Sequence, residues 1–364
     1  MTYTTDGDLE SPQHPHHRPL PSRRDVAPHG GGAGLLVAEA HRFVSRRFIR
    51  WLLGLAVLAY LVIVPLVAVT QFGRTTEAVR AQARTEIARL VAEQNGFREQ
   101  CIAQPLPPDA PEGTTPEELC GPAGTPADYR VEDFLPKRPF VLGEYLQPGA
   151  LAVGVAVAAL FFVVGATWIG AEWSARTMTA LLFWETRRLR VLAAKTGVLV
   201  GVTAVVAALA QVVWAGSAWV LASTRGTTSG LPKGFWGDVA ALGGRTALLA
   251  VITALLGFGV AHLIRSTGAA LGVGFVYFAV VESAVGAVRP AWQEWLLTIN
   301  AGALVVKGGA TVFVPGKAVD DTTGEVVEFT EKTISNLHGG LVLGGVTVAL
   351  LLLGGWLFRR RDLT

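Results

Sequence analysis

Residues 51–72 read WLLGLAVLAYLVIVPLVAVTQF, a stretch without a single charged side chain. About 20 apolar residues in a helix are enough to cross the hydrocarbon core of a bilayer. More apolar runs of that length follow, near 149–169, 196–222, 245–264, 268–288 and 340–358. Inside lipid the backbone must satisfy its own hydrogen bonds, so each run is expected to be helical. The sequence therefore predicts an all-α integral membrane protein with six transmembrane helices.

The composition excludes an ordinary soluble protein. Hydrophobic residues make up 51% of the chain and charged residues 16%, whereas soluble domains carry roughly 25% charged residues. The net charge of +3 does not call for a nucleic-acid partner, because the arginines flank the apolar runs. At such places they orient a protein in the bilayer.

The segment before the first span falls into two parts. Residues 1–34 are rich in Pro, Gly and His, which predicts a disordered tail without the layout of a secretory signal. We interpret His14, His16 and His17 as part of a solvated tail rather than as a metal site. Residues 35–50 have the spacing of an amphipathic helix that lies in the membrane interface. Glu39 is expected on its polar face with the arginines, and the alternative that these arginines only flank the first span is compatible with this.

The loops predict how the chain is oriented. Basic residues recur near the N-terminal flank, between spans two and three, between spans four and five, and at the C-terminus, whereas the loop after span five is acidic. The positive-inside rule places the basic segments in the cytoplasm. The basic residues are Arg176, Arg187, Arg188, Arg190, Lys195, Arg265, Arg359, Arg360 and Arg361. We expect a multi-pass protein of the cell (plasma) membrane with both termini cytoplasmic.

Two long segments are then external. The first, 73–148, begins with helical spacing, becomes Pro-rich and contains both cysteines, Cys101 and Cys120. The oxidising exterior favours a disulfide between them, with two free thiols as the alternative. The second, 289–339, begins with a short amphipathic helix and continues as two short strands around a turn.

No catalytic motif occurs in the chain. The only Gly-Lys pair, Gly316-Lys317, has Thr311 and Ala318 where a phosphate loop needs a glycine and a hydroxyl. HExxH, GxSxG and CxxC are all absent, and the histidines after the tail are scattered along the sequence. We therefore expect no enzyme activity, no metal site and no nucleotide cofactor bound by this chain.

The most informative loop is 170–195, GAEWSARTMTALLFWETRRLRVLAAK. An acidic residue closes span two, and a Ser/Thr-rich turn, a Leu-Leu pair, a basic cluster and an opening Lys follow. This order, with the interfacial helix, the six spans and the helical excursion before span six, resembles the permeases of type-2 ATP-binding-cassette (ABC) exporters. The alternative is a generic cytoplasmic turn whose arginines only follow the positive-inside rule.

The resemblance implies a partner and a mechanism. In that family the loop forms a coupling helix that docks on a separate ABC ATPase subunit carrying ATP and magnesium, and two permease chains, identical or different, enclose the transport path. Glu172, Thr177, Arg188 and Lys195 take matching positions by resemblance. Arg176 and Glu185 depart from the family pattern, which leaves the substrate open. The candidate coupling residues are Glu172, Thr177, Met178, Leu181, Leu182, Trp184, Arg187 and Arg188.

The expected organisation combines these elements. It comprises a disordered cytoplasmic tail 1–34, an interfacial helix 35–50, span one 51–72, an extracellular domain 73–148, span two 149–169, a cytoplasmic coupling loop 170–195, span three 196–222, an extracellular loop 223–244, span four 245–264, span five 268–288, an extracellular helix and hairpin 289–339, span six 340–358 and a cytoplasmic tail 359–364.

Polar residues within the spans are candidates for the substrate path. Glu282, in the outer half of span five, would cost about 2.5–3.5 kcal/mol at the bilayer centre. It is either a polar contact on the path or a structural partner of Arg245 or Arg289. Gln211, in span three, is better interpreted as an interhelical hydrogen-bond donor. Close helix packing is expected at Gly268-x3-Gly272 and Gly340-x3-Gly344.

The functional prediction is a permease subunit that moves a substrate (a drug, lipid, peptide or other small molecule) outward by alternating access. The first alternative is a membrane sensor or assembly scaffold that does not transport. The second is a secondary transporter, which would be expected to show broken helices and repeated ion-coupling charges.

Overall fold

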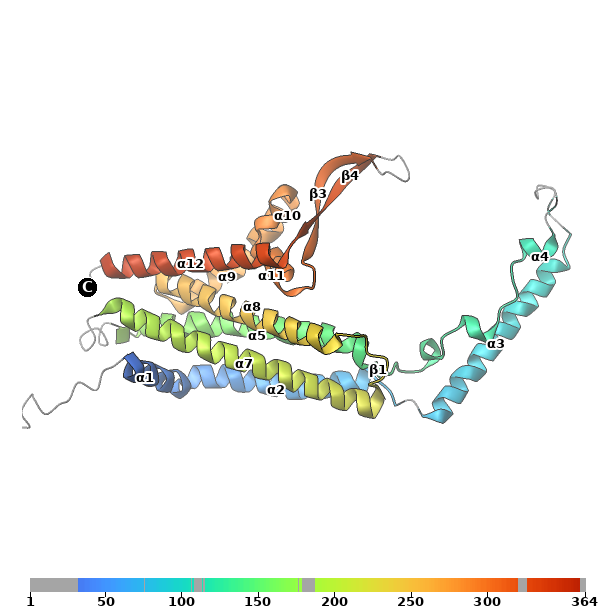
Figure 1. The fold of residues 1–364 in the computed structure, drawn as a ribbon, viewed down its shortest axis with the longest axis horizontal. Coiled ribbons are helices and arrows are strands. Elements are labelled where there is room, and N and C mark those ends of the chain that lie inside the picture. Colours follow the sequence, from blue (N-terminus) through green and yellow to red (C-terminus); the bar gives the residue numbers. More distant parts are fainter. Residues whose placement is uncertain are drawn as a thin grey trace, which may run out of the picture.

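The computed structural model describes residues 32–74, 76–105, 107, 113, 115–175, 177–178, 187–319 and 326–360. Long helices run side by side in a bundle, and an arm extends beyond one end of it (Figure 1). Among the described residues six helices are long and apolar enough to cross a membrane, which confirms the predicted fold class. They are α2 (Arg47–Gln71), α5 (Leu142–Ser174), α7 (Arg188–Arg225), α8 (Phe235–Ile264), the continuous segment Thr267–Val288 and α12 (Asn336–Arg360).

The fifth of these helices is irregular. It consists of α9 (Thr267–Val276), a π-helical turn η3 (Tyr277–Val281) and α10 (Glu282–Val288). A π-turn holds one extra residue in its hydrogen-bonded ring, and such turns occur frequently at functional sites. The turn ends directly before Glu282, the acidic residue of this span.

Helices α5 and α8 form the centre of the bundle. A methyl group added at Gly165 of α5 would lie 2.0 Å from the Ala254 carbonyl oxygen of α8, and one at Gly257 of α8 would lie 2.1 Å from the Phe162 carbonyl oxygen of α5. Only glycine fits at these two positions, because the backbones nearly touch. In a membrane such close van der Waals packing replaces the hydrophobic driving force between helices.

The glycine pairs expected to pack closely do not do so within this chain. No atom from elsewhere lies within 4 Å of a methyl group added at Gly268, Gly272 or Gly344, and Gly340 is only in ordinary contact with Leu304. Helix α12 instead approaches a neighbouring backbone at Gly339, where the added methyl group would lie 2.5 Å from the Asn300 carbonyl oxygen. Spacing alone misplaced the contact because glycine is frequent in every span.

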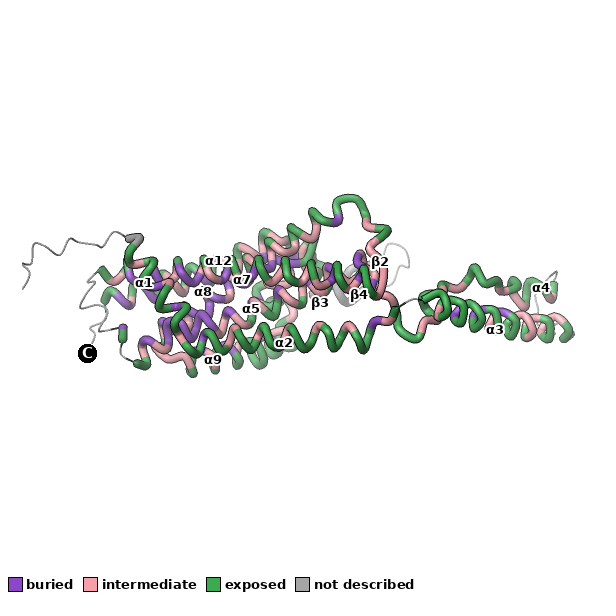
Figure 2. The backbone as a smooth tube through the Cα atoms, turned by 90° about the horizontal axis from the view of Figure 1, so that it is seen from below, coloured by how far each residue is buried: buried purple, intermediate pink, exposed green. Residues whose placement is uncertain are grey.

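Helix α2 lies at the periphery. Most of its residues are exposed and the others are mainly intermediate in burial (Figure 2), and only 6% of its most apolar window is buried within the chain. Because these side chains are apolar, their exposure fits a surface that faces lipid. Helix α1 (Gly32–Ser45) precedes α2, turns at Arg46 and packs along the beginning of α7.

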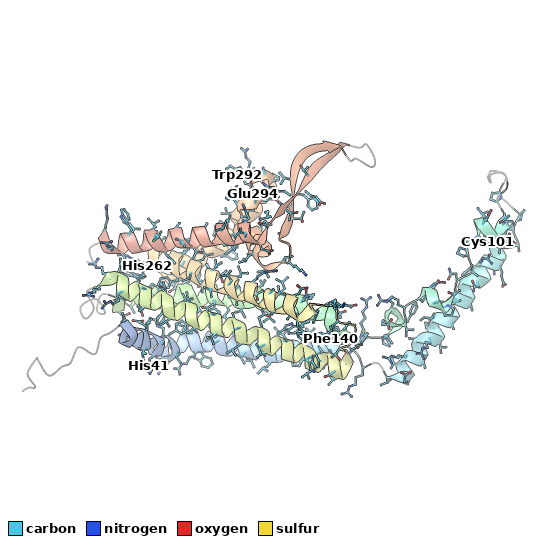
Figure 3. All side chains as sticks on the ribbon, viewed as in Figure 1. His41, Cys101, Phe140, His262, Trp292 and Glu294 are labelled. Atoms are coloured by element: carbon cyan, nitrogen blue, oxygen red, sulfur yellow. A yellow bond between two sulfur atoms is a disulfide. The ribbon has the colours of Figure 1, made fainter. Side chains whose placement is uncertain are left out.

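The segment between α2 and α5 is an arm built on α3 (Glu77–Ile102), followed by α4 (Pro116–Leu119) and the short turns η1 (Pro126–Asp128) and η2 (Val131–Phe134). A disulfide joins Cys101 to Cys120, as predicted, and Figure 3 places Cys101 far from the bundle. The returning chain is also held along α3, since the Arg98 Nε donates to the Gly121 carbonyl over 2.7 Å. At the base of the arm, β1 (Phe140–Val141) pairs with β2 (Gly226–Thr227).

The segment between α10 and α12 contains the predicted helix and hairpin. The short turn η4 (Pro290–Trp295) leads into α11 (Leu297–Val305), and β3 (Ala310–Val319) pairs antiparallel with β4 (Val326–Ile334). The connecting residues 320–325, where the sequence predicts the turn, lie outside the described part of the chain.

Candidate functional site

Three charged side chains from three helices meet inside the bundle, at the end that carries α1 and Arg360. Lys195 of α7 places its Nζ 2.6 Å from Glu39 Oε2 of α1 and 2.8 Å from the Glu172 carboxylate of α5. Lys195 and Glu39 have no exposed surface, and Glu172 is 5% exposed. Ionised groups are buried to this degree only when they are paired, so these residues hold the three helices together.

Arg46, in the turn between α1 and α2, completes the cluster. Its Nη2 lies 2.6 Å from Glu172 Oε1, and its Nη1 donates to the Trp168 carbonyl oxygen over 3.0 Å. Burial lowers the pKa of Arg46 from its ordinary value, while the carboxylates of Glu172 and Glu39 act in the opposite direction. We call Glu39, Arg46, Glu172 and Lys195 the buried charge cluster.

The Trp168 ring packs against both cations of the buried charge cluster. The ring is fully buried, with the Arg46 guanidinium 4.5 Å and the Lys195 ammonium 4.6 Å from its centroid. Cations over an indole face are attracted by its negative π surface, and more strongly when water is excluded. Phe43 of α1 packs edge-on against the same ring, which adds an apolar contact between α1 and α5.

The sequence prediction that Glu39 lies on an exposed polar face with the arginines was wrong. Glu39 lies on the buried side of α1, whereas the apolar Val37 and Val44 are exposed. Its carboxylate also accepts a hydrogen bond from half-exposed Arg42 over 3.0 Å. The reason is non-local, because the ammonium that makes burial of Glu39 favourable comes from Lys195. A single acidic residue in a strongly basic interfacial helix was the available signal.

The buried charge cluster brackets the loop that the sequence analysis singled out. Glu172 lies near its beginning and Lys195 at its end, so the loop leaves and re-enters the bundle at one site. Thr177 is exposed, and its hydroxyl donates to the Glu172 carbonyl over 3.4 Å. Leu181, Leu182 and Trp184 lie outside the described residues.

Two predicted docking residues are internal instead. Met178 is fully buried in the same apolar cluster as Phe43 and Trp168, and Glu172 belongs to the buried charge cluster. Neither offers a surface to a partner, since Met178 has no exposed surface and Glu172 is 5% exposed.

The two arginines at the end of the loop differ in their surroundings. Arg187 is exposed and immediately precedes α7. Arg188 donates to the Phe358 carbonyl oxygen of α12 over 2.8 Å and lies 5.8 Å from the centroid of the Phe358 ring. Arg188 therefore ties the beginning of α7 to the end of α12.

Glu282, the buried carboxylate of the fifth span, accepts from the Thr298 backbone N–H over 3.0 Å and from the Thr298 hydroxyl. It thereby caps the N-terminus of α11. Among the ion pairs of the described residues none joins Glu282 to Arg245 or Arg289, and Arg245 donates to the Val305 carbonyl instead. Both structural pairings considered for Glu282 were therefore wrong.

Gln211 of α7 donates to the Ala150 carbonyl of α5 over 3.0 Å and to the Thr246 hydroxyl of α8 over 3.1 Å. The predicted interhelical hydrogen bond is therefore present, and it connects three spans. Such bonds contribute about 0.6 kcal/mol each on average in a membrane bundle.

The histidines in the described part of the chain do not gather into a metal site. His41 and His262 lie on different helices, as labelled in Figure 3, and the His262 Nδ1 accepts from the Trp173 indole over 3.2 Å. Among the described residues no group of three or more His, Cys, Asp or Glu could hold a metal ion. His14, His16 and His17 lie outside the described part of the chain.

In a comparison with models of protein families, a family model matches residues 40–363 and so nearly the whole chain. The family is described as ABC-2 family transporter protein. The match includes the buried charge cluster except Glu39, together with all six long helices. A comparison with curated proteins found no match.

Proposed function

This chain belongs to the ABC-2 transporter family, and we propose that it is the permease subunit of an exporter whose energy comes from a separate ATPase. Membership identifies a membrane transport component of an ABC system, which favours the permease over the sensor, the scaffold and the secondary transporter. In this proposal a substrate moves outward, and ATP and magnesium bind the ATPase subunit. The basic end of the bundle faces the cytoplasm, with both termini there, because basic loops stay on that side of the plasma membrane.

The buried charge cluster is the observation that carries the proposal. It fixes both ends of the loop between α5 and α7 to α1 through contacts of 2.6 and 2.8 Å. Separating a buried ion pair is strongly unfavourable because it leaves an uncompensated charge in a medium of low dielectric constant. A force applied to the loop is therefore passed to α1, α5 and α7 as one unit. This is the property that a coupling element needs.

The docking surface in this proposal is the outer part of the loop. Leu181, Leu182 and Trp184 supply the apolar contacts, with exposed Arg187 at the rim. A short helix that fills a groove with such anchors is a recurrent mode of recognition. Buried Met178 has a different role, since it anchors the loop to the bundle. The rival interpretation is that these apolar side chains contact the membrane surface.

The transport path in this proposal lies between two permease chains, identical or different. Glu282 is the candidate polar contact near its outer end, because it is a buried carboxylate directly after a π-turn. Gln211 is the second candidate, in the middle of the third span, although its hydrogen bonds join helices of one chain.

Co-purification tests the proposal. An affinity-tagged permease is isolated from membranes of its native host, and retention of an ATPase is measured together with transport. Leu181→Asp combined with Trp184→Ala is expected to lose the ATPase and transport while the permease inserts normally. Val37→Asp is the matched control, because it places the same charge at an apolar position of α1 that is 70% exposed. If the loop contacts only the membrane, the double variant retains the ATPase, and the proposal fails.

A further inference from the structure

The beginning of α2 carries two arginines side by side on the outside of the bundle. Arg47 and Arg50 are both exposed, and side chains three positions apart in a helix are neighbours. Among the residues that the structure describes, neither guanidinium takes part in a hydrogen bond or an ion pair. The only acidic residue of α1 and α2 is Glu39, which is buried and paired with Lys195. Nothing on these two helices therefore offsets the two exposed charges, and the function proposed above does not use them.

The face of α2 that carries Arg47 continues as an apolar stripe along the span. Trp51, Gly54, Leu58 and Leu61 follow at steps of four, three, four and three residues. These steps place all of them on one face of the helix. All four residues are exposed, and Trp51 is 77% exposed. The stripe therefore faces lipid rather than another helix of this chain.

Trp51 and Gly54 indicate the depth of this face and the space in front of it. Exposed tryptophans of membrane proteins prefer the level of the lipid headgroups, so Arg47 and Arg50, within about one turn of Trp51, are at that level too. In the described part of the chain no atom from elsewhere lies within 4 Å of a methyl group added at Gly54. The helix thus offers two charges at headgroup depth and open space directly below them. We call Arg47, Arg50, Trp51 and Gly54 the Arg47 surface.

We propose that the Arg47 surface binds an anionic phospholipid, with its phosphate between the two guanidinium groups and an acyl chain over Gly54. Arginine matches phosphate oxygens with paired N–H donors, and basic residues beside a spanning helix attract anionic headgroups. A free phosphate ion shares this chemistry but makes no use of the apolar stripe. A protein outside the membrane could reach the arginines, but it could not reach Leu58 within the span. The observations therefore favour the lipid.

The bound lipid also acts on the buried charge cluster. Arg46 directly precedes Arg47, and its Nη2 lies 2.6 Å from Glu172 Oε1. A headgroup held by Arg47 and Arg50 restrains the turn between α1 and α2, on which Arg46 lies. A ligand that binds only the folded protein stabilises it, so phosphatidylglycerol should raise the melting midpoint of the parent protein above its value in phosphatidylcholine. An equal rise in a variant without both arginines would overturn the proposal.

Lipid titration followed by native mass spectrometry measures the binding itself, on the full-length protein in detergent. Short-chain phosphatidylglycerol is compared with phosphatidylcholine of the same chain length, and the parent is expected to bind phosphatidylglycerol more tightly. Each arginine near a headgroup contributes about 1 kcal/mol, so Arg47→Gln should weaken this binding about 5-fold and Arg47→Gln with Arg50→Gln about 30-fold. The single variant keeps the test valid if the double variant inserts poorly. Equal affinity of the parent for the two lipids would overturn the proposal.

Arg359→Gln is the matched control. It removes one exposed arginine from the end of α12, and Figure 1 places α12 on the opposite side of the bundle from α2. Salt largely screens exposed charges that lie far apart, so the affinity of this variant for phosphatidylglycerol should stay within about twofold of the parent value. Equal losses in Arg47→Gln and Arg359→Gln would overturn the proposal, because binding would then depend on general charge.

Two further measurements separate other occupants. Millimolar inorganic phosphate should not compete with phosphatidylglycerol, and competition would assign the Arg47 surface to the free ion and overturn the lipid proposal. A co-purified ATPase should be retained by Arg47→Gln with Arg50→Gln. Loss of the ATPase with lipid affinity unchanged would assign the arginines to the protein partner and would equally overturn the lipid proposal.

Discussion

Lys195→Met is the sharpest perturbation of the buried charge cluster. The side chain of Lys195 has no exposed surface, and its ammonium lies 2.6 Å from Glu39 and 2.8 Å from Glu172. Removing one partner of a buried ion pair costs about 3–5 kcal/mol. Arg46 remains 2.6 Å from Glu172 and Arg42 remains 3.0 Å from Glu39, so we expect a loss near the lower limit, about 3 kcal/mol.

Thermal stability in detergent measures this loss. The monodisperse fraction is followed by size-exclusion chromatography after heating, and for a chain of this length a loss of about 3 kcal/mol corresponds to a midpoint roughly 4 °C lower. Lys307→Met is the control, because its pair with Asp238 spans 2.9 Å but Lys307 is 73% exposed. Exposed pairs contribute about 0–1 kcal/mol, so this variant should melt within about 2 °C of the parent.

A double variant separates the contribution of the Glu39–Lys195 ion pair from the other effects of each substitution. Glu39→Gln with Lys195→Met removes both charges, and its loss should be smaller than the sum of the two single losses. Equal melting midpoints for Lys195→Met and Lys307→Met would refute the reasoning. Removal of a buried ammonium that lies between two carboxylates must cost more stability than removal of an exposed ammonium.

Three further predictions concern other parts of the chain. Replacing Cys101 and Cys120 by Ser should destabilise the arm by about 3 kcal/mol in the chain-entropy model, measured as faster proteolysis of the arm alone; an unchanged rate would contradict it. Gly165→Val should abolish monodisperse protein, because its side chain meets the Ala254 carbonyl, and normal elution would show that α5 and α8 are not this close. Glu282→Gln should lower stability by about 1–3 kcal/mol through the weakened cap of α11, and if Glu282 also lies on the path, transport should fall more than the folded fraction; equal falls would refute the path role.

The spans were predictable because the signal is local. Length and apolar composition decide whether a helix can cross lipid, and both can be read within one stretch of sequence. The ends of the helices were less predictable. Helix α7 begins at Arg188 and α5 at Leu142, several residues before the apolar runs near 196 and 149, because a helix continues past the membrane wherever its residues permit.

The candidate site was only partly predictable, for a different reason. Glu172 and Lys195 could be named from their places around the loop, but the contact between Lys195 and Glu39 joins residues far apart in the sequence. The burial of Met178 in an apolar cluster with Phe43 of α1 is also non-local, and side-chain polarity does not reveal it. The disulfide was easier, because the chain has only two cysteines and both lie in the one segment between the first two spans.

Photo-crosslinking from Leu182 tests the central claim most directly. A photoreactive amino acid is placed at this position in the permease expressed in its native host, and at Phe97 of the arm as the control. The account predicts that position 182 crosslinks a polypeptide with the phosphate-loop motif of an ABC ATPase, and that position 97 does not. Crosslinks from position 182 to lipid alone, in a permease that still transports, would contradict the claim that this loop couples the bundle to an ATPase.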